Sequence, residues 1–146
     1  MSDISNHFLI NTEAAIYRDG KWLVCVRSKS ESEAAGLLSF VGGTVEHTDA
    51  REDTLESGLV REIQEEIGVR VAVKAFVNDT SFVSKKGNYV INIVFLCTIE
   101  SGEPRIVATD ELDDLLWLTT EEILAYPNVP PWLCVSVKKA HDILGA

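Results

Sequence analysis

The stretch REIQEEIGV, from Arg61 to Val69, crowds three glutamates into five residues near the end of an expected helix. The last turn of a helix carries partial negative charge and favours cations, so Glu62, Glu65 and Glu66 stand where the backbone opposes them. Glu62 and Glu66 are also a like-charge pair four residues apart, which weakens a helix slightly. This crowding predicts that positive charge is supplied from outside the helix.

The helix is predicted to run from about Thr54 to Ile67 and to stop at Gly68. At about 100° per residue, its apolar residues form one buried stripe: Leu55, Leu59, Ile63 and Ile67. The three glutamates border this stripe, and Glu66 overlaps it. A solvated acidic face, the usual meaning of a charge run, would lie opposite the stripe instead. Carboxylates that face the protein body need a cation, and oxygen-rich clusters suit Mg²⁺ or Mn²⁺.

Gly58 lies one turn before Glu62 in the same predicted helix. A glycine in a helix interior costs roughly 1 kcal/mol relative to alanine. Two explanations are open: close packing against a neighbouring segment, or room for a ligand above the carboxylates.

The composition restricts the class of partner. The chain has 146 residues, 46% of them hydrophobic and 25% charged, with a formal net charge of -10. An acidic surface repels phosphate backbones, which argues against nucleic acid and anionic membranes as partners. A small anionic substrate stays possible, because a bound cation reverses the charge locally.

Cys25 and Cys97 lie in apolar runs and are expected as core thiols. We find no secretory signal and no membrane span, and expect a cytoplasmic protein.

Strands and helices alternate along the chain, which predicts one mixed α/β domain over residues 1–146. Asp19-Gly20 is a hairpin signal that joins two strands within residues 13–27. Further strands are expected at residues 69–79, 88–100 and 115–118. A short helix capped by Thr119 or Thr120 and a last helix from Pro131 complete the chain.

The acidic stretch resembles the signature of the Nudix hydrolases, G-x5-E-x7-R-E-U-x-E-E-x-G-U, where U is bulky and aliphatic. Residues 61–69 fit its second half at every specified position, and Gly42-Gly43 fits the double glycine that opens the signature. Two departures stand out. Asp53 replaces the first Glu, and nine residues rather than five separate it from Gly43, so residues 47–53 carry a four-residue insertion.

The resemblance implies an α/β/α sandwich around a mixed sheet. It also implies Mg²⁺-dependent hydrolysis, with Mn²⁺ as an alternative ion, of a nucleoside diphosphate linked to another group. Glu62, Glu65 and Glu66 would hold the metal together with the Gly43 carbonyl, and Gly42 would contact the substrate.

Two further roles follow from the same resemblance. Arg61 would orient a carboxylate through a bidentate contact, with Asp53 or Glu46 as its partner. The general base would be a glutamate of the signature, Glu62 among them, or Glu111 in the acidic loop before Trp117. A solvated surface loop explains Glu111 equally well.

Other polar and aromatic residues carry weaker signals. Arg27 follows a strand and is a candidate for phosphate contact, although a surface arginine is the simpler interpretation. The tryptophans are expected in the core or at its rim, with base stacking as the alternative.

Two rival functions remain open on sequence alone. One is a Nudix-fold domain that binds a nucleotide without hydrolysing it, and the other is an acidic interaction module. The complete set of signature carboxylates favours the enzyme. The substrate is not specified by the sequence, and the oligomeric state is open, a homodimer included.

Overall fold

The computed structural model describes residues 6–31 and 33–145. The ends of the predicted domain, residues 1–5 and 146, lie outside this part, and so does most of the segment searched for a secretory signal. None of the helices in the described ranges is long and apolar enough to cross a membrane.

The strands form one mixed sheet whose central order is β3-β2-β1-β6-β5, with β4 paired to β1 and β7 paired to β2. Their bounds are β1 Leu9–Arg18, β2 Lys21–Arg27, β3 Leu38–Ser39, β4 Val41–Thr44, β5 Arg70–Val83, β6 Tyr89–Ser101 and β7 Leu112–Leu118. The β1–β6 pair is parallel, and it places Asn11 opposite Asn92. The other pairs are antiparallel.

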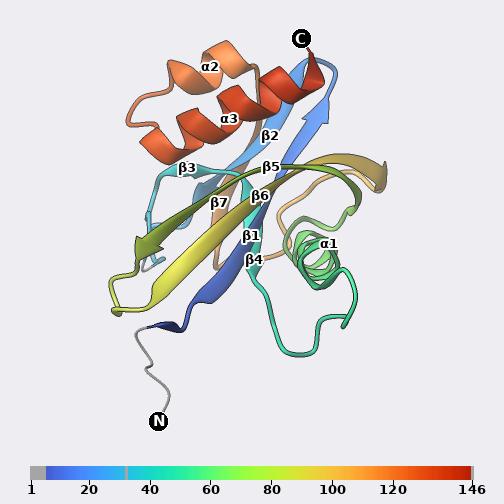
Figure 1. Ribbon diagram of the computed structural model, residues 1–146. Coiled ribbons are helices and arrows are strands. Elements are labelled where there is room, and N and C mark those ends of the chain that lie inside the picture. The colour runs from blue at the N-terminus through green and yellow to red at the C-terminus, as the bar shows by residue number, and fades with distance from the viewer. Residues whose placement is uncertain (1–5, 32, 146) are drawn as a thin grey trace.

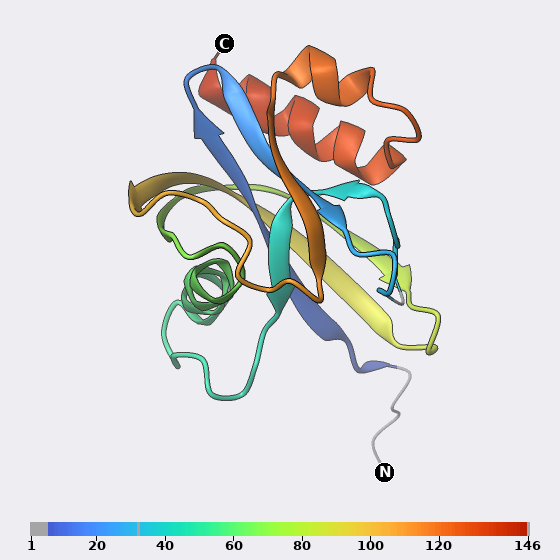
Figure 2. The same cartoon turned by 180° about the vertical axis from the view of Figure 1, so that it is seen from behind.

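Helices cover both faces of the sheet (Figures 1 and 2). Helix α1, Thr54–Ile67, lies on one face, while α2, Thr120–Leu124, and α3, Pro131–Leu144, lie together on the other. Successive residues of β1 point to opposite faces, so Ala14 packs with the α1 side and Ala15 with the α3 side. The expected α/β/α sandwich is confirmed.

Local signals placed the helices accurately. Helix α1 spans the predicted residues, and Gly68 ends it in the left-handed conformation at φ 71°. Thr119 and Glu122 form a capping box at the start of α2, and Pro131 opens α3. The Asp19-Gly20 turn also has positive φ at both residues, which matches the twist of the β1–β2 hairpin.

The strands are longer than predicted. β1 begins at Leu9 rather than Glu13, β5 continues to Val83, and β7 begins at Leu112. The added residues include polar side chains such as Asn11 and Thr80, which line a cavity and so break the apolar pattern of a strand. No strand was predicted for residues 38–44, which form β3 and β4.

Candidate functional site

The carboxylates at the end of α1 are arranged as the helical wheel predicted, with one difference. Glu66 is 6% exposed, and the Glu62 side chain is 15% exposed. The Glu65 side chain is 59% exposed, because it lies farthest from the buried stripe. Glu62 and Glu66 therefore face the protein body, whereas Glu65 lies at the rim.

Glu66 is buried without a compensating charge. Among the described residues, its Oε2 is one of two buried side-chain oxygens that lack a hydrogen-bond partner. Burial, followed by the negative charges of Glu111 and Glu62, raises the pKa of Glu66 to about 9. Burial likewise raises the pKa of Glu62. These carboxylates are assembled where a cation would relieve their repulsion.

Glu111 reaches this cluster from the loop between β6 and β7. Its carbonyl accepts a hydrogen bond from the Ser28 amide at 2.8 Å, and its amide donates to the Ala108 carbonyl at 3.0 Å. The side chain is close enough to raise the pKa of Glu66. The loop is therefore already anchored beside the cluster, and Glu111 need not swing over the site from a distance.

Arg61 is held by Asp49, a residue of the insertion. Its Nε lies 2.8 Å from Asp49 Oδ1, and its Nη2 lies 3.3 Å from Asp49 Oδ2. The Asp49 side chain is only 3% exposed, and the Arg61 guanidinium holds its pKa below the usual range. The bidentate contact expected of Arg61 is present, but it is made by Asp49 rather than by Asp53 or Glu46. Glu46 makes a looser ion pair, with its Oε1 3.8 Å from Arg61 Nη1, and Asp53 caps α1 with an exposed side chain.

The register of the insertion explains this correction. Asp53 adopts a left-handed conformation at φ 54°, which turns the chain at the start of α1. Asp49 folds back instead, and its Oδ2 accepts a hydrogen bond from the Glu46 amide at 2.8 Å. A carboxylate four residues earlier than the counted position thus reaches the arginine.

Arg61 also contacts the signature glutamates. Its Nη1 lies 3.2 Å from both Glu62 Oε1 and Glu65 Oε2, and its Nη2 lies 3.4 Å from the Thr44 carbonyl. The arginine consequently ties the insertion, the end of β4 and the carboxylates of α1 into one unit.

Three glycines let these groups approach one another. A methyl group on Gly58 would lie 2.7 Å from Asp49 Oδ2, so this glycine makes room for Asp49 rather than for a ligand. A methyl group on Gly43 would lie 2.5 Å from Glu62 Oε2, and one on Gly42 would overlap the Thr12 carbonyl. Side chains at these positions would push β4 away from β1 and from α1.

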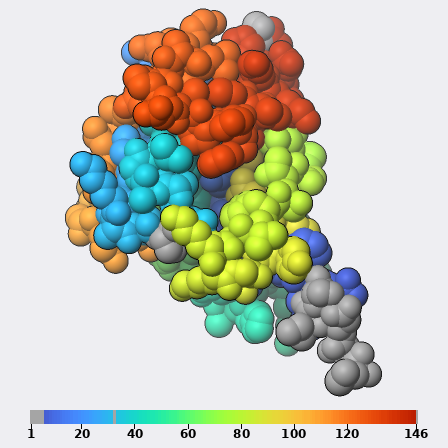
Figure 3. Space-filling view, turned by 90° about the vertical axis from the view of Figure 1, so that its left-hand side faces the viewer, coloured from blue at the N-terminus to red at the C-terminus, as the bar shows by residue number. Residues whose placement is uncertain are grey.

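A cavity of about 700 Å³ opens beside the carboxylates. Glu62, Glu111 and the Gly42-Gly43 backbone line one end. Figure 3 shows the hollow between the loop before β3, the tip of the β5–β6 hairpin and the start of α3. Its volume suits a nucleotide-sized ligand.

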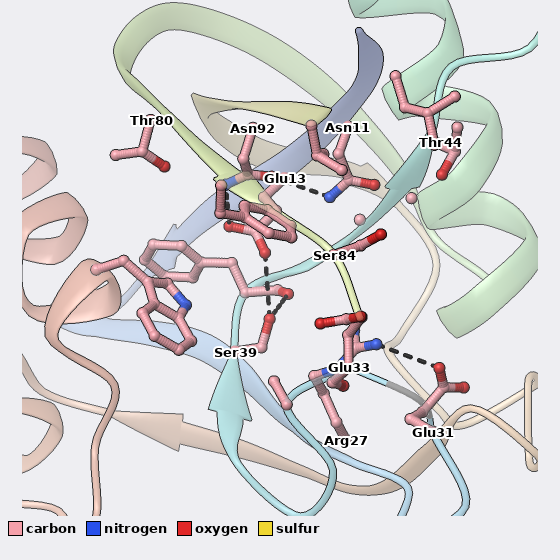
Figure 4. Close-up of a pocket in the computed structure, with 18 of the residues that line it drawn as sticks. Asn11, Glu13, Arg27, Glu31, Glu33, Ser39, Thr44, Thr80, Ser84 and Asn92 are labelled. Carbon is pink, nitrogen blue, oxygen red and sulfur yellow. Dashed lines mark hydrogen bonds and ion pairs between the residues drawn. The ribbon is translucent and has the colours of Figure 1, made fainter. Parts of the chain in front are cut away.

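Arg27 lines this cavity, but its guanidinium is engaged by its own loop. Its Nε donates to the Glu33 carbonyl at 2.9 Å, and its Nη2 lies 3.2 Å from Glu31 Oε2. Figure 4 shows Arg27 beside these two residues at the edge of the cavity. Phosphate contact by Arg27 stays a prediction, and it would need this pairing to be exchanged.

Trp132 is the tryptophan for which base stacking stays open. It is 48% exposed and lines the cavity, whereas Trp22 is buried in the core. Trp117 packs at the core rim under the Arg18 guanidinium. Position in the fold therefore separates three residues that the sequence treated alike.

The donor set at the carboxylate end fits a hard divalent cation. Glu62 and Glu66 offer carboxylate oxygens, Glu66 Oε2 without a hydrogen-bond partner, and the Gly43 backbone is pressed against Glu62. Within residues 6–31 and 33–145, however, no three His, Cys, Asp or Glu side chains are placed so that they could hold a metal ion together. Arg61 accounts for part of this, because it engages Glu62 and Glu65.

Comparison with known proteins settles the family. The sequence model of the NUDIX domain matches residues 9–133. The chain belongs to the Nudix family. The fold, the family and the enzyme class expected from the signature, a hydrolase of phosphorus-containing acid anhydrides, are confirmed.

Individual relatives of this Nudix protein agree with that assignment. A CTP pyrophosphohydrolase of Escherichia coli (strain K12) is 32% identical over 123 residues, which cover 80% of each chain. The nucleoside triphosphatase NudI of Enterobacter sp. (strain 638) is 29% identical over 118 residues, covering 74% of this chain and 79% of that one. A MutT NUDIX hydrolase structure from Burkholderia pseudomallei has a TM-score of 0.78 at 24% identity and covers 92% of this chain and 98% of its own.

The sequence interpretation missed two features of the Nudix site. Asp49 stands at the G-x5-E spacing counted from Gly43, and Gly58 in the helix indicated that something packs there, but the count back from Arg61 favoured Asp53. A polar cluster on the cavity floor, formed by Asn11, Glu13 and Asn92 with Ser39, was also missed. Polar residues inside the apolar strands of residues 9–18 and 89–101 were the available signal.

Proposed function

We propose that this Nudix protein hydrolyses a phosphoanhydride bond of a nucleoside triphosphate and depends on Mg²⁺, with Mn²⁺ as an alternative. Water attacks a phosphorus atom, a bridging P–O bond breaks, and a nucleoside monophosphate and pyrophosphate leave. The observation that carries the proposal is the buried, unpartnered Glu66 carboxylate beside Glu62 and Glu111 at one end of a 700 Å³ cavity.

The proposed metal ligands are Glu62, Glu65, Glu66 and the Gly43 carbonyl. A bound Mg²⁺ neutralises charge on phosphate oxygens and orients the attacking water. Arg61 positions Glu62 and Glu65 through its Nη1, while Asp49 fixes the guanidinium from behind. Gly42 and Gly43 keep the cavity wall free of side chains where phosphate would approach.

Glu111 is proposed as the group that takes the proton from the attacking water. It lies on a separate segment from the signature helix, so it is free of the requirement to hold metal. Its anchored backbone places it at the cavity beside Glu66. Glu62 is the alternative base.

A triphosphate is favoured over other nucleoside diphosphate derivatives by the relatives. The two curated proteins described above are named as a CTP pyrophosphohydrolase and a nucleoside triphosphatase. This chain aligns with about four-fifths of the length of each relative, and the aligned part includes the signature region.

The test is a substrate panel assayed with Mg²⁺, with Mn²⁺, and after exhaustive chelation. The panel contains the common nucleoside triphosphates, ADP-ribose and a nucleotide sugar, and pyrophosphate and phosphate release are measured separately. We expect pyrophosphate release from a triphosphate that disappears with the chelator and returns with Mg²⁺. Full turnover after chelation refutes the metal role. Binding of a panel member without turnover favours the rival function, a Nudix-fold domain that binds a nucleotide without hydrolysing it.

The base assignment is tested by comparing Glu111→Gln with Glu66→Gln. Glu111→Gln should lower kcat and leave Mg²⁺ affinity nearly unchanged, whereas Glu66→Gln should weaken both. The measurements are kcat against pH and Mg²⁺ titrations of each variant. Wild-type activity of Glu111→Gln across the pH range assigns the proton transfer to another group, with Glu62 next in line.

A further inference from the structure

The cavity floor carries a second connected group of polar side chains, two of which, Asn11 and Glu13, lie on β1 opposite Thr44 and Gly42 of β4. Asn11 Nδ2 donates to Asn92 Oδ1 at 2.9 Å, and Asn92 Nδ2 donates to Glu13 Oε1 at 3.0 Å. Ser39 Oγ lies 3.2 Å from Glu13 Oε2. We call these four residues the floor cluster. Figure 4 shows them facing one another from β1, β6 and β3.

The hydrogen bonds of the floor cluster all run toward Glu13. Ser39 has one hydroxyl hydrogen, and its shorter contact, 2.6 Å, is to the Phe40 carbonyl rather than to Glu13. Glu13 Oε2 therefore receives at most a shared hydrogen bond. A carboxylate accepts about four hydrogen bonds, so Glu13 keeps acceptor capacity on the cavity side.

A purely structural role explains the floor cluster poorly. The next residues on the same face of the sheet, Ala15 and Val94, are apolar and buried and pack in the core without polar side chains. A carboxylate removed from water costs free energy unless it is paired, and the Arg27 guanidinium, whose charge acts on Glu13, forms its ion pair with Glu31. Burial accordingly raises the pKa of Glu13. A ligand that donates to Glu13 would offset this cost.

The cavity around the floor cluster has the walls of a base-binding site. Phe82 and Trp132 line it with exposed rings, 44% and 48% respectively, and Phe40 adds a buried ring. Aromatic side chains stack on nucleobases of any kind. Glu13 and Glu62 line the same cavity, so a base beside Glu13 and phosphates beside Glu62 belong to one ligand.

We propose that Glu13 accepts a hydrogen bond from an exocyclic amino group on the substrate's base. The free Nδ2 hydrogen of Asn92 donates to the ring nitrogen or carbonyl next to that amino group. A base with a carbonyl at the same position places its lone pairs against the carboxylate and is rejected. This inference rests on the proposed function and adds its substrate class: nucleoside triphosphates with an amino-bearing base.

Three matched substrate pairs test the preference. CTP and UTP differ by amino against carbonyl at one ring position, as do ATP and ITP, and GTP carries an amino group that ITP lacks. We expect kcat/KM to favour the amino member by about tenfold to hundredfold in at least one pair, the range for one well-placed polar contact to a base. Equal or reversed ratios in all three pairs overturn the inference.

Glu13→Gln tests whether Glu13 is the reader. An amide of the same shape can turn its NH₂ toward a carbonyl, so the variant's amino-to-carbonyl ratio should fall to about one. Glu33→Gln is the control, because it removes the same charge from the cavity lining but lies outside the floor cluster. It should retain the wild-type ratio. A Glu13→Gln protein that folds by circular dichroism and keeps the full ratio contradicts the proposal.

Binding separates failure of this inference from failure of the proposed function. Calorimetry with CMP against UMP, AMP against IMP and GMP against IMP reads base preference without turnover. A Glu13-dependent preference for the amino-bearing monophosphate in a protein that hydrolyses no triphosphate keeps the subsite and rejects the hydrolase proposal. Pyrophosphate release from triphosphates with no preference in rate or affinity does the reverse.

Discussion

Asp49, which packs against α1, and Glu66, which lies in α1, are both buried carboxylates with opposite electrostatic environments. Asp49 accepts hydrogen bonds from Nε and Nη2 of the Arg61 guanidinium, which lower the pKa of Asp49. Glu66 faces Glu62 and Glu111, and its pKa rises to about 9. Asp49 is paired with the positive charge of Arg61, whereas Glu66 has no compensating positive charge.

This difference separates support from chemistry. A carboxylate that is fully paired by the protein holds other groups in position, as Asp49 holds Arg61. A carboxylate left unpaired in a buried place is costly, and such groups gather at functional sites. Asp49 therefore belongs to a structural ion pair, whereas Glu66 belongs to the proposed metal site.

The largest expected effect comes from Glu66→Gln. The amide keeps the shape but removes the charge, so we expect kcat to fall at least about hundredfold, the lower range for losing a strong electrostatic contributor. The metal-free variant should melt at or above the wild-type temperature, because an amide avoids the repulsion from Glu62 and Glu111. Steady-state kinetics at saturating Mg²⁺ and thermal melts in chelator measure both. A wild-type kcat would place Glu66 among the structural carboxylates.

Asp49→Asn breaks the paired side. We expect a loss of about 1–3 kcal/mol in the free energy of unfolding, typical for hydrogen bonds to charged groups, together with a smaller loss of kcat. Urea titration at neutral pH measures the stability change. Asp53→Asn is the matched control, since Asp53 has no side-chain cap bond and asparagine tolerates its left-handed backbone. It should stay within about 0.5 kcal/mol of wild type. Equal losses in both variants would remove the distinction between Asp49 and Asp53.

The pH dependence of metal-free stability sharpens the same comparison. The folded pKa of Glu66, about 9, exceeds the unfolded value of about 4.3. Its contribution is therefore fully present below about pH 4 and is lost as pH rises toward 9. In chelator, the melting temperature of wild type should fall relative to that of Glu66→Gln between about pH 5 and 9. Mg²⁺ should reduce the fall. Parallel melting curves of the two proteins across that range would argue against it.

Gly58→Ala gives the smallest expected effect and depends on Asp49. Alanine favours a helix over glycine by roughly 1 kcal/mol, but its methyl group would crowd Asp49 Oδ2. We expect little gain or a slight loss in wild type, and a gain of about 0.5–1 kcal/mol in an Asp49→Ala background. A double-mutant cycle measures this coupling. Additive changes would mean that Gly58 is not there to admit Asp49.

Local signals predicted much of this site. The stripe, the stop at Gly68 and the position of Glu66 follow from helical periodicity, which depends on residues within one segment. The family signature then supplied roles for residues 61–69. The bidentate contact between Arg61 and a carboxylate was expected from the resemblance to the family, and the structure has it.

The errors lie where distant segments meet. Asp49 reaches Arg61 because the insertion turns back on itself, whereas counting back from Arg61 over seven intervening residues pointed to Asp53 instead. The floor cluster needs the register that sets Asn11 beside Asn92, residues 81 positions apart. Neither contact leaves a periodic trace in its own segment.

The parallel pairing of β1 with β6 also has a consequence for the order of folding. The β1–β2 hairpin closes across a two-residue turn, Asp19-Gly20. We expect the β1–β6 pair to form later, because α1 and the strands β2 to β5 lie between its two strands in the sequence. Closing such a long segment costs chain entropy before the contacts between its ends can form. The floor of the cavity is thus among the last parts to form. A chain that has folded only its N-terminal hairpin has no cavity floor, so small-molecule binding there reports on completion of the entire sheet.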